Sequence, residues 1–167
     1  MIAIVDTNVA VVANQQAPQA SSDCVRWCVQ RLRTLQRTGC VVIDDGWRIL
    51  NEYKDNLREQ GQPGVGDAFL RWLLRNRSNP RFCCQVHITP GAASATATDF
   101  AEFPQDPALA AFDPSDRKFV AVAVAHPEHP PVLNAVDSDW WDHREALAQH
   151  GVQVEFLCPD APFMQGG

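Results

Sequence analysis

The chain has 167 residues, of which 46% are hydrophobic and 20% are charged. This composition is typical of one globular domain, which we expect to span residues 1–167. The formal net charge of −6 argues against a broad basic surface for nucleic acid. No apolar run approaches the roughly 20 residues of a membrane span, and the start of the chain lacks the features of a signal peptide. We therefore expect a cytoplasmic protein with no membrane partner.

The first expected element is a strand formed by Ile2-Ala3-Ile4-Val5, which is apolar on both faces. Such a short β-branched run is typical of a strand that is buried on both sides in a parallel sheet. Ligands of parallel sheets bind outside the carboxyl ends of the strands. Asp6, which follows the run, therefore lies where a central strand delivers a catalytic or metal-binding carboxylate, although a simple helix cap is the alternative.

Two strands and three helices are expected between this strand and residue 90. Apolar spacing predicts helices over 22–38, 46 to about 60, and 67 to about 76. Residues 40–43 form a second buried strand, and residues 82–89 alternate in the manner of a strand at the edge of a sheet.

The six cysteines are Cys24, Cys28, Cys40, Cys83, Cys84 and Cys158. Because the chain shows no export signal, we expect reduced thiols in or near the core. Cys24 and Cys28 share one helix face, but neither a C-x-x-C pair nor a nearby histidine completes a zinc site.

The second half of the chain begins with an irregular stretch over 90–112 that is rich in Ala, Thr and Pro and long for a loop. Asp113-Pro114-Ser115-Asp116 then predicts a helix start, with a cap, a proline and a first-turn acid. Residues 119–125 alternate valine with alanine, a pattern open to helix and strand, and the cap and alanine content favour a helix. The remaining expected elements are a strand over 131–136, a helix over 137–150 and a strand over 152–157. This order predicts an α/β fold in which helices cover both faces of a parallel sheet.

Carboxylates recur at the strand ends or on the helices beside them. They are Asp6, Glu52, the pair Asp113 and Asp116, and the pair Asp137 and Asp139. Converging carboxylates resist joint ionisation unless a cation lies between them, and hard oxygen ligands select Mg²⁺ or Mn²⁺. Each acid also has a simpler explanation, as a helix cap, a first-turn acid or part of a solvated stripe. Their joint placement carries the prediction of a metal site.

The joint pattern resembles the PIN domain family of metal-dependent ribonucleases. The matching segments are Ile4-Val5-Asp6-Thr7-Asn8, Glu52, the run from Asp113 to Ala123, and Asp137-Ser138-Asp139-Trp140. The resemblance implies a three-layer α/β/α sandwich with a central five-stranded, mainly parallel sheet. It also implies an acidic pocket for Mg²⁺ or Mn²⁺ and an endoribonuclease that cleaves RNA. Many small bacterial members are toxins held inactive by a partner, so the expected partners are RNA, an antitoxin or other inhibitor protein, and a second copy in a homodimer.

The resemblance also implies roles for individual residues. It makes Asp6, Glu52, Asp116 and Asp139 the catalytic acids, with metal ligands drawn from Asp6, Asp116, Asp139 and Asp137. Asp139 is the preferred fourth acid, and Asp137 stays open as the alternative. Asn8, Arg117 and Lys118 would orient the substrate.

One departure from the family pattern suggests an alternative function. The threonine or serine usually found before the fourth acid is missing, and Asn134 stands in this region. If Asn134 does not substitute as an orienting group, the chain is a catalytically weakened binding or scaffold module that acts through protein partners. A phosphoacceptor receiver domain, suggested by Asp44-Asp45, is disfavoured because no lysine follows Lys118. Trp140 and Trp141 are open to base stacking or to core packing.

Overall fold

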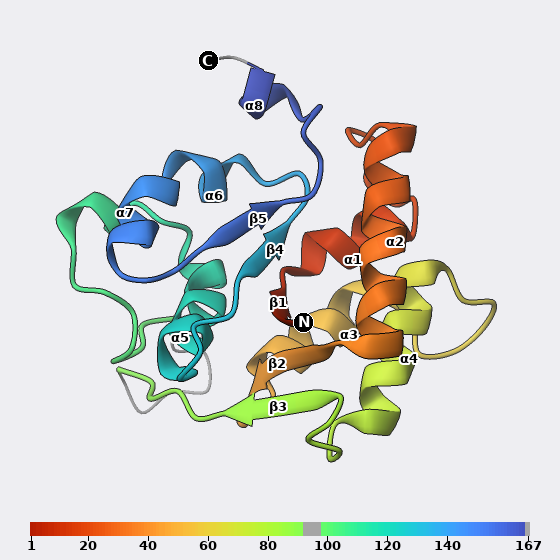
Figure 1. Ribbon diagram of the computed structural model, residues 1–167, viewed down its shortest axis with the longest axis horizontal. Coiled ribbons are helices and arrows are strands. Elements are labelled where there is room, and N and C mark those ends of the chain that lie inside the picture. Colours follow the sequence, from red (N-terminus) through yellow and green to blue (C-terminus); the bar gives the residue numbers. More distant parts are fainter. Residues whose placement is uncertain (92–97, 166–167) are drawn as a thin grey trace.

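The computed structural model describes residues 1–91 and 98–165 and has a five-stranded sheet at its centre (Figure 1). The sheet order is β3-β2-β1-β4-β5, and every neighbouring pair of strands is parallel. The strands are β1 (Ile2–Val5), β2 (Cys40–Asp44), β3 (Cys83–Val86), β4 (Val132–Asn134) and β5 (Val154–Phe156). This arrangement confirms the predicted α/β fold with a five-stranded parallel sheet.

The position of β1 at the centre of the sheet explains its sequence. Ala3, Ile4 and Val5 are inaccessible to solvent because helices cover both faces of the sheet, as expected for a parallel sheet. In the register of the sheet, Ile2 lies opposite Cys40 of β2 and Ile4 lies opposite Val132 of β4. β3 lies at an edge, as its alternating pattern predicted.

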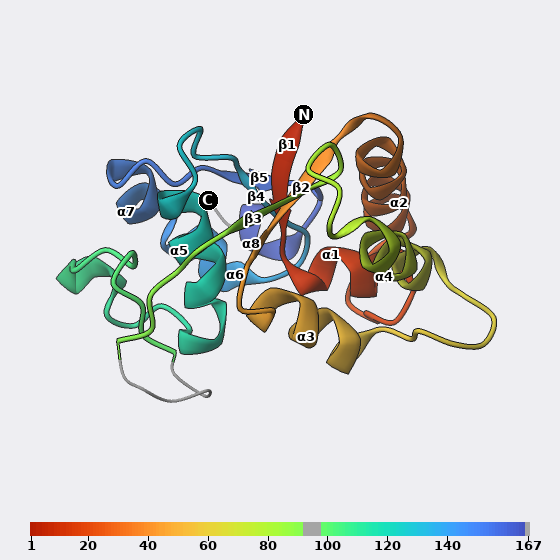
Figure 2. The same cartoon turned by 90° about the horizontal axis from the view of Figure 1, so that it is seen from below.

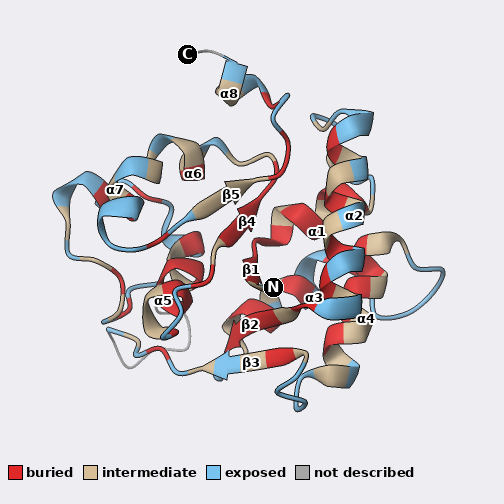
Figure 3. Ribbon diagram, viewed as in Figure 1, coloured by how far each residue is buried: buried red, intermediate tan, exposed pale blue. Residues whose placement is uncertain are grey.

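Helices cover both faces of the sheet (Figure 2). The view from below shows α1, α2 and α4 on one side and α5, α6 and α7 on the other. The helices are α1 (Thr7–Ala13), α2 (Ser22–Thr38), α3 (Arg48–Asn56), α4 (Val65–Asn76), α5 (Arg117–Ala125), α6 (Ser138–Asp142), α7 (Arg144–Gln149) and α8 (Pro162–Gln165), and short 3-10 helices span Pro107–Leu109 and Pro114–Asp116. Buried residues gather along the strands and the inward faces of these helices (Figure 3). None of the helices in the described ranges is long and apolar enough to cross a membrane.

The helices differ from the sequence-based expectation in several places. α8 was not predicted, and α3 ends at Asn56 rather than near residue 60. α1 was not predicted, and it forms because Asp6 caps its first turn and its valines and alanines are buried against the core. The expected helix over 137–150 is divided into α6 and α7 at His143, whose φ and ψ of −104° and 6° leave the helical range. The segment after Asp116 is helical, which confirms the choice of helix over strand for 119–125.

Within the long stretch over 90–112, residues 92–97 lie outside the described ranges, and the residues before and after them are described. Its aromatic side chains fix the described part to the core. Phe100, Phe103 and Phe112 are at most 8% exposed, and the rings of Phe103 and Phe112 stack with centroids 6.0 Å apart. The described part of the stretch therefore packs against the core, and its short 3-10 helix at Pro107–Leu109 contacts α7.

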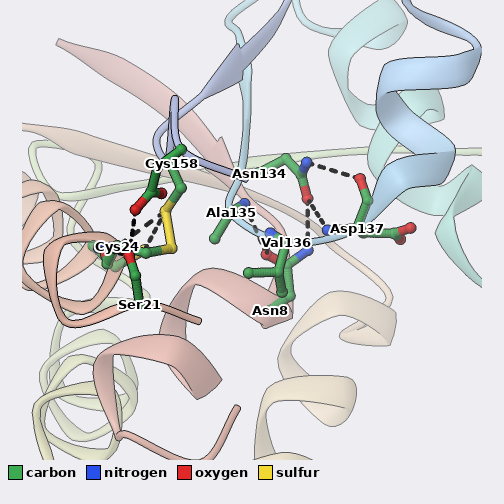
Figure 4. Close-up of a disulfide and its surroundings, with 10 residues drawn as sticks. Asn8, Ser21, Cys24, Asn134, Ala135, Val136, Asp137 and Cys158 are labelled. Atoms are coloured by element: carbon green, nitrogen blue, oxygen red, sulfur yellow. Dashed lines mark hydrogen bonds between the residues drawn. A yellow bond between two sulfur atoms is a disulfide. The ribbon is translucent and has the colours of Figure 1, made fainter. Parts of the chain in front are cut away.

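The expectation that all six cysteines are free thiols is wrong. Cys24 of α2 and Cys158, which follows β5, form a disulfide (Figure 4). The two residues are separated by 134 positions in the sequence, so only the tertiary fold brings them together. The other cysteines, Cys28, Cys40, Cys83 and Cys84, are free thiols.

Candidate metal centre

The strand order reverses between β1 and β4, and we call the region outside the carboxyl ends of these two strands the crevice. The chain proceeds from β1 outward to β2 and β3, and then crosses to the other side of β1 to form β4 and β5. In an open parallel sheet, ligands bind outside the carboxyl ends of the strands at the point where the order reverses. Asp6 follows β1, and Asp137 follows β4 after a short turn, so both residues lie at this point for a topological reason alone.

Three carboxylates meet at this crevice. One oxygen each from Asp6, Asp116 and Asp137 lies within 4.8 Å of the other two. Asp6 and Asp116 are 4% and 8% exposed, and Asp137 is half-buried. The cluster thus combines the end of β1, the start of α5 and the turn after β4, and it brings together three of the predicted site residues.

The first carboxylate is fixed by two hydrogen bonds. Asp6 Oδ1 accepts from the backbone N–H of Asn8 at 2.9 Å, and Asp6 Oδ2 accepts from the indole Nε1 of Trp140 at 2.7 Å. Trp140 is completely buried, so it belongs to the core and cannot stack on a base. The sequence indicated core packing for Trp140 but gave no signal of its bond to Asp6.

The turn that carries Asp137 is organised by two asparagines (Figure 4). Asn134 donates its side-chain N–H to the carbonyl of Asp137 at 3.0 Å and accepts from the side chain of Asn8 at 2.8 Å. Asn8 Oδ1 in turn accepts the backbone N–H of Ala135 at 2.8 Å. Asn134 therefore acts as an orienting group for the turn, and Asn8 joins α1 to that turn.

The charge balance of the cluster is unfavourable without a cation. Burial, followed by the nearby charges of Asp6 and Asp137, raises the pKa of Asp116 to about 9. Burial also raises the pKa of Asp6 to about 7, despite its bonds from Asn8 and Trp140. Within the described ranges, no Lys, Arg or His forms an ion pair with any of the three acids, and no hydrogen-bond donor reaches the Asp116 carboxylate.

Glu52 borders the cluster but has partners of its own. Its carboxylate accepts hydrogen bonds from the Thr7 hydroxyl and from Lys118 Nζ, the latter at 2.8 Å. Glu52 is not one of the three mutually close carboxylates. Its negative charge nevertheless contributes to the raised pKa of Asp6 and of Asp116, so it faces the same crevice.

Asp139, the preferred fourth acid, is directed elsewhere. Its Oδ2 accepts the backbone N–H of Asp113 at 2.9 Å, and its Oδ1 lies 3.2 Å from His143 Nδ1. Asp113 itself caps the 3-10 helix through the N–H of Ser115. The structure thus places Asp137, rather than Asp139, beside Asp6 and Asp116, and gives Asp139 a role in holding the start of the α5 region.

The predicted substrate-orienting cations are engaged within the protein. Arg117 pairs with Asp99 at 2.6 Å and lies over the ring of Phe103, 4.8 Å from its centroid. Lys118 pairs with Glu52. Both side chains are at most 15% exposed, so Arg117 fixes the preceding loop and Lys118 supplies a positive charge at the border of the crevice.

The donor set fits a hard divalent cation. Three carboxylates from separate elements offer only oxygen ligands, which Mg²⁺ and Mn²⁺ prefer, and the raised pKa values of Asp6 and Asp116 agree with buried negative charge that no ion pair within the described ranges offsets. No thiol or imidazole belongs to this group of ligands, which disfavours a zinc site at this position. No family model, curated protein or solved structure matches the chain in the comparisons with known proteins.

Proposed function

We propose that the protein is a divalent-metal-dependent endoribonuclease that cleaves phosphodiester bonds of RNA. The observation that carries the proposal is the meeting of Asp6, Asp116 and Asp137 at the carboxyl ends of β1 and β4. The choice of RNA as substrate rests on the resemblance of the sequence segments around these acids to PIN domains. With that resemblance come the further proposals of an antitoxin or inhibitor partner, a homodimer and a cytoplasmic location.

The three acids would hold Mg²⁺ or Mn²⁺. When bound, the ion supplies Lewis-acid stabilisation of the phosphate charge and lowers the pKa of an attacking water. The chain fixes the ligands in advance: Trp140 holds Asp6, while Asn134 holds the turn of Asp137. Such support of ligands by neighbouring hydrogen bonds commonly contributes 10–100-fold in metal affinity or activity.

Lys118 has a separate role at the border of the crevice. Its ammonium group neutralises Glu52, so less negative charge opposes an approaching phosphate. Among the described residues, Arg117 and Lys118 are already paired with Asp99 and Glu52. Together with the net charge of −6, this pairing predicts that RNA binds poorly in the absence of a divalent ion.

The test combines metal binding with cleavage. Titration calorimetry with Mn²⁺ should show binding to the wild-type protein, and the same protein with Mn²⁺ should cleave single-stranded RNA. Asp116→Asn should lose both properties, whereas Asp142→Asn, a matched change of an exposed acid on α6, should keep both. Cleavage retained by Asp116→Asn would exclude this mechanism.

The alternative of a weakened binding or scaffold module has one supporting observation. The close cluster contains three acids, and both Glu52 and Asp139 are engaged by other partners. Wild-type protein that is folded but binds Mn²⁺ only weakly and cleaves no RNA would favour this alternative.

A further inference from the structure

A hollow lies between the start of α2, the turn after β4 and the segment after β5. It has a volume of about 400 Å³ and is lined partly by Ser21, Val136, Ser138, Asp160 and Phe163. Val136 and Ser138 are the chain neighbours of Asp137, so the hollow begins beside one of the three clustered carboxylates. In Figure 4, Val136 is drawn between the disulfide, whose Cys24 also lines the hollow, and Asp137.

A smaller hollow adjoins this one beside α1 and α3. Its volume is about 270 Å³, and Thr7, Asn8 and Glu52 contribute to its lining. Gln19 and Val136 line both hollows, so the two adjoin. Thr7 and Asn8 follow Asp6, and Val136 and Ser138 flank Asp137, so the two hollows are lined by the chain neighbours of two of the clustered acids.

We propose that the larger hollow, which we call the base pocket, binds one nucleobase of the RNA next to the phosphate at the acid cluster, and that it prefers guanine. This inference rests on the proposed ribonuclease function. The base pocket offers Phe163 and Val136 as apolar surface and Ser21, Ser138 and Asp160 as polar groups. Proteins that recognise single-stranded RNA hold unstacked bases in this way, by aromatic contact and by hydrogen bonds to the base edge.

Asp160 argues for guanine in particular. An ionised carboxylate only accepts hydrogen bonds, and its two oxygens match two neighbouring donors. Among the four bases, only guanine presents two adjacent donors, N1–H and the 2-amino group, on its pairing edge. Adenine and cytosine present an acceptor beside their amino group, and uracil has an acceptor on each side of its one donor.

The position of Asp160 is fixed by the fold. Its Oδ2 accepts a hydrogen bond from the Ser21 hydroxyl at 2.5 Å, which leaves Oδ1 and the second lone pair of Oδ2 available to the two donors of a ligand. The Cys24–Cys158 disulfide joins α2 to the segment that carries Asp160. Phe163 packs against Trp141, with ring centroids 6.2 Å apart. Both walls of the base pocket are therefore held before a ligand binds.

Binding of short RNAs tests the proposal. Fluorescent single-stranded oligouridines that carry one guanosine or one inosine should be compared by anisotropy in the presence of Ca²⁺. Inosine lacks only the 2-amino group, so we expect wild-type protein to bind the guanosine RNA about tenfold more tightly. Asp160→Asn should remove most of this difference, and Phe163→Ala should weaken the binding of both RNAs about tenfold.

Matched variants control for general effects. Phe82→Ala removes a partly buried ring that packs on Trp72, beside the edge strand β3, and Asp142→Asn removes an exposed acid outside the base pocket. Both should bind like wild type. Because Phe163 also packs against Trp141, the stability of Phe163→Ala should be checked by thermal melting. Asp160 is exposed, so Asp160→Asn still tests the proposal if Phe163→Ala is unstable.

The outcomes separate this inference from the proposed function. Cleavage with Mn²⁺ that shows no preference for guanosine, and base-pocket variants that bind like the controls, would overturn the base pocket and leave the ribonuclease intact. Discrimination of guanosine from inosine that Asp160→Asn removes would support the base pocket even if no RNA were cleaved, and the nuclease proposal alone would then fail. Equal binding of both RNAs by wild-type protein would overturn the assignment to guanine.

Discussion

Two buried carboxylate regions of this molecule are opposite in character. Asp67, on α4, is completely buried, and its oxygens accept hydrogen bonds from Asn14 Nδ2, Arg58 N and Gly64 N at 2.8–2.9 Å. Burial alone would raise the pKa of Asp67, but these bonds lower it overall. At the crevice, burial and the negative charges of neighbouring acids raise the pKa of Asp116, and no hydrogen bond from a described residue to its carboxylate offsets this rise.

The contrast shows that the donors and charges around a buried acid, rather than its burial alone, decide whether its pKa is lowered or raised. Asp67 receives its donors from the protein itself and fixes the entry into α4. The crevice acids share more negative charge than their hydrogen-bond donors offset, and this imbalance is the basis on which we propose a bound cation. The predictions below test this difference, from the largest expected effect to the smallest.

The largest effect is expected on cleavage at the crevice. Asp6→Asn should reduce Mn²⁺-dependent RNA cleavage by at least about 1000-fold, because a neutral amide is a poor ligand for a hard cation. Asp45→Asn is the matched control, since Asp45 directly follows the neighbouring strand β2, its side chain is 46% exposed and pairs with His87, and it is not one of the three clustered carboxylates. Equal losses in the two variants, measured as initial rates, would contradict a special role for Asp6.

The next effect is expected on stability at Asp67. Asp67→Ala should lower the free energy of unfolding by about 3 kcal/mol, because three buried or half-buried donors lose their acceptor. Urea denaturation followed by circular dichroism measures this change. Asp116→Ala should cost much less under the same conditions without metal, since no described donor depends on its carboxylate. A larger loss for Asp116→Ala would reverse the comparison.

The third effect is the pH dependence of stability without metal. The pKa of Asp116 rises from 3.8 in the unfolded chain to about 9 in the fold, so the folded state binds the proton more tightly. This contribution to stability is complete below pH 3.8 and is lost as the pH rises toward 9. Asp116→Asn should therefore be more stable than wild type at pH 8, by about 2 kcal/mol, and less so at pH 5.

The higher stability that we expect for Asp116→Asn at pH 8 should depend on whether the metal is present. Saturating Mn²⁺ should stabilise the wild-type protein and not the variant, which would remove or invert the difference at pH 8. Thermal melts at the two pH values, with and without Mn²⁺, measure all four conditions. A wild-type protein whose stability rises from pH 5 to pH 8 without metal would argue against the charge repulsion described for the crevice.

The smallest effect distinguishes Asp137 from Asp139. Asp137→Asn should weaken Mn²⁺ binding about tenfold more than Asp139→Asn, because Asp137 lies in the cluster and Asp139 binds the backbone N–H of Asp113. Titration calorimetry measures both affinities. The reverse order would show that Asp139 turns toward the crevice when the metal binds.

The sequence by itself determined the layers of the fold and the identity of the acids that follow its strands. The apolar run of β1 predicted a central strand, because a strand buried on both faces needs apolar residues at every position. Asp113 and Pro114 predicted the start of the α5 region, since caps and first-turn prolines act locally. Asp6 was predicted to lie at a strand end because it directly follows this apolar run.

Only the tertiary structure decided which of these acids meet. Asp137 and Asp139 are two residues apart and equally acidic, and the turn held by Asn134 directs one into the crevice and the other toward Asp113. The bond from Trp140 to Asp6 and the Cys24–Cys158 disulfide join residues 134 positions apart. Such contacts depend on the packing of whole elements, for which a local sequence pattern contains no information.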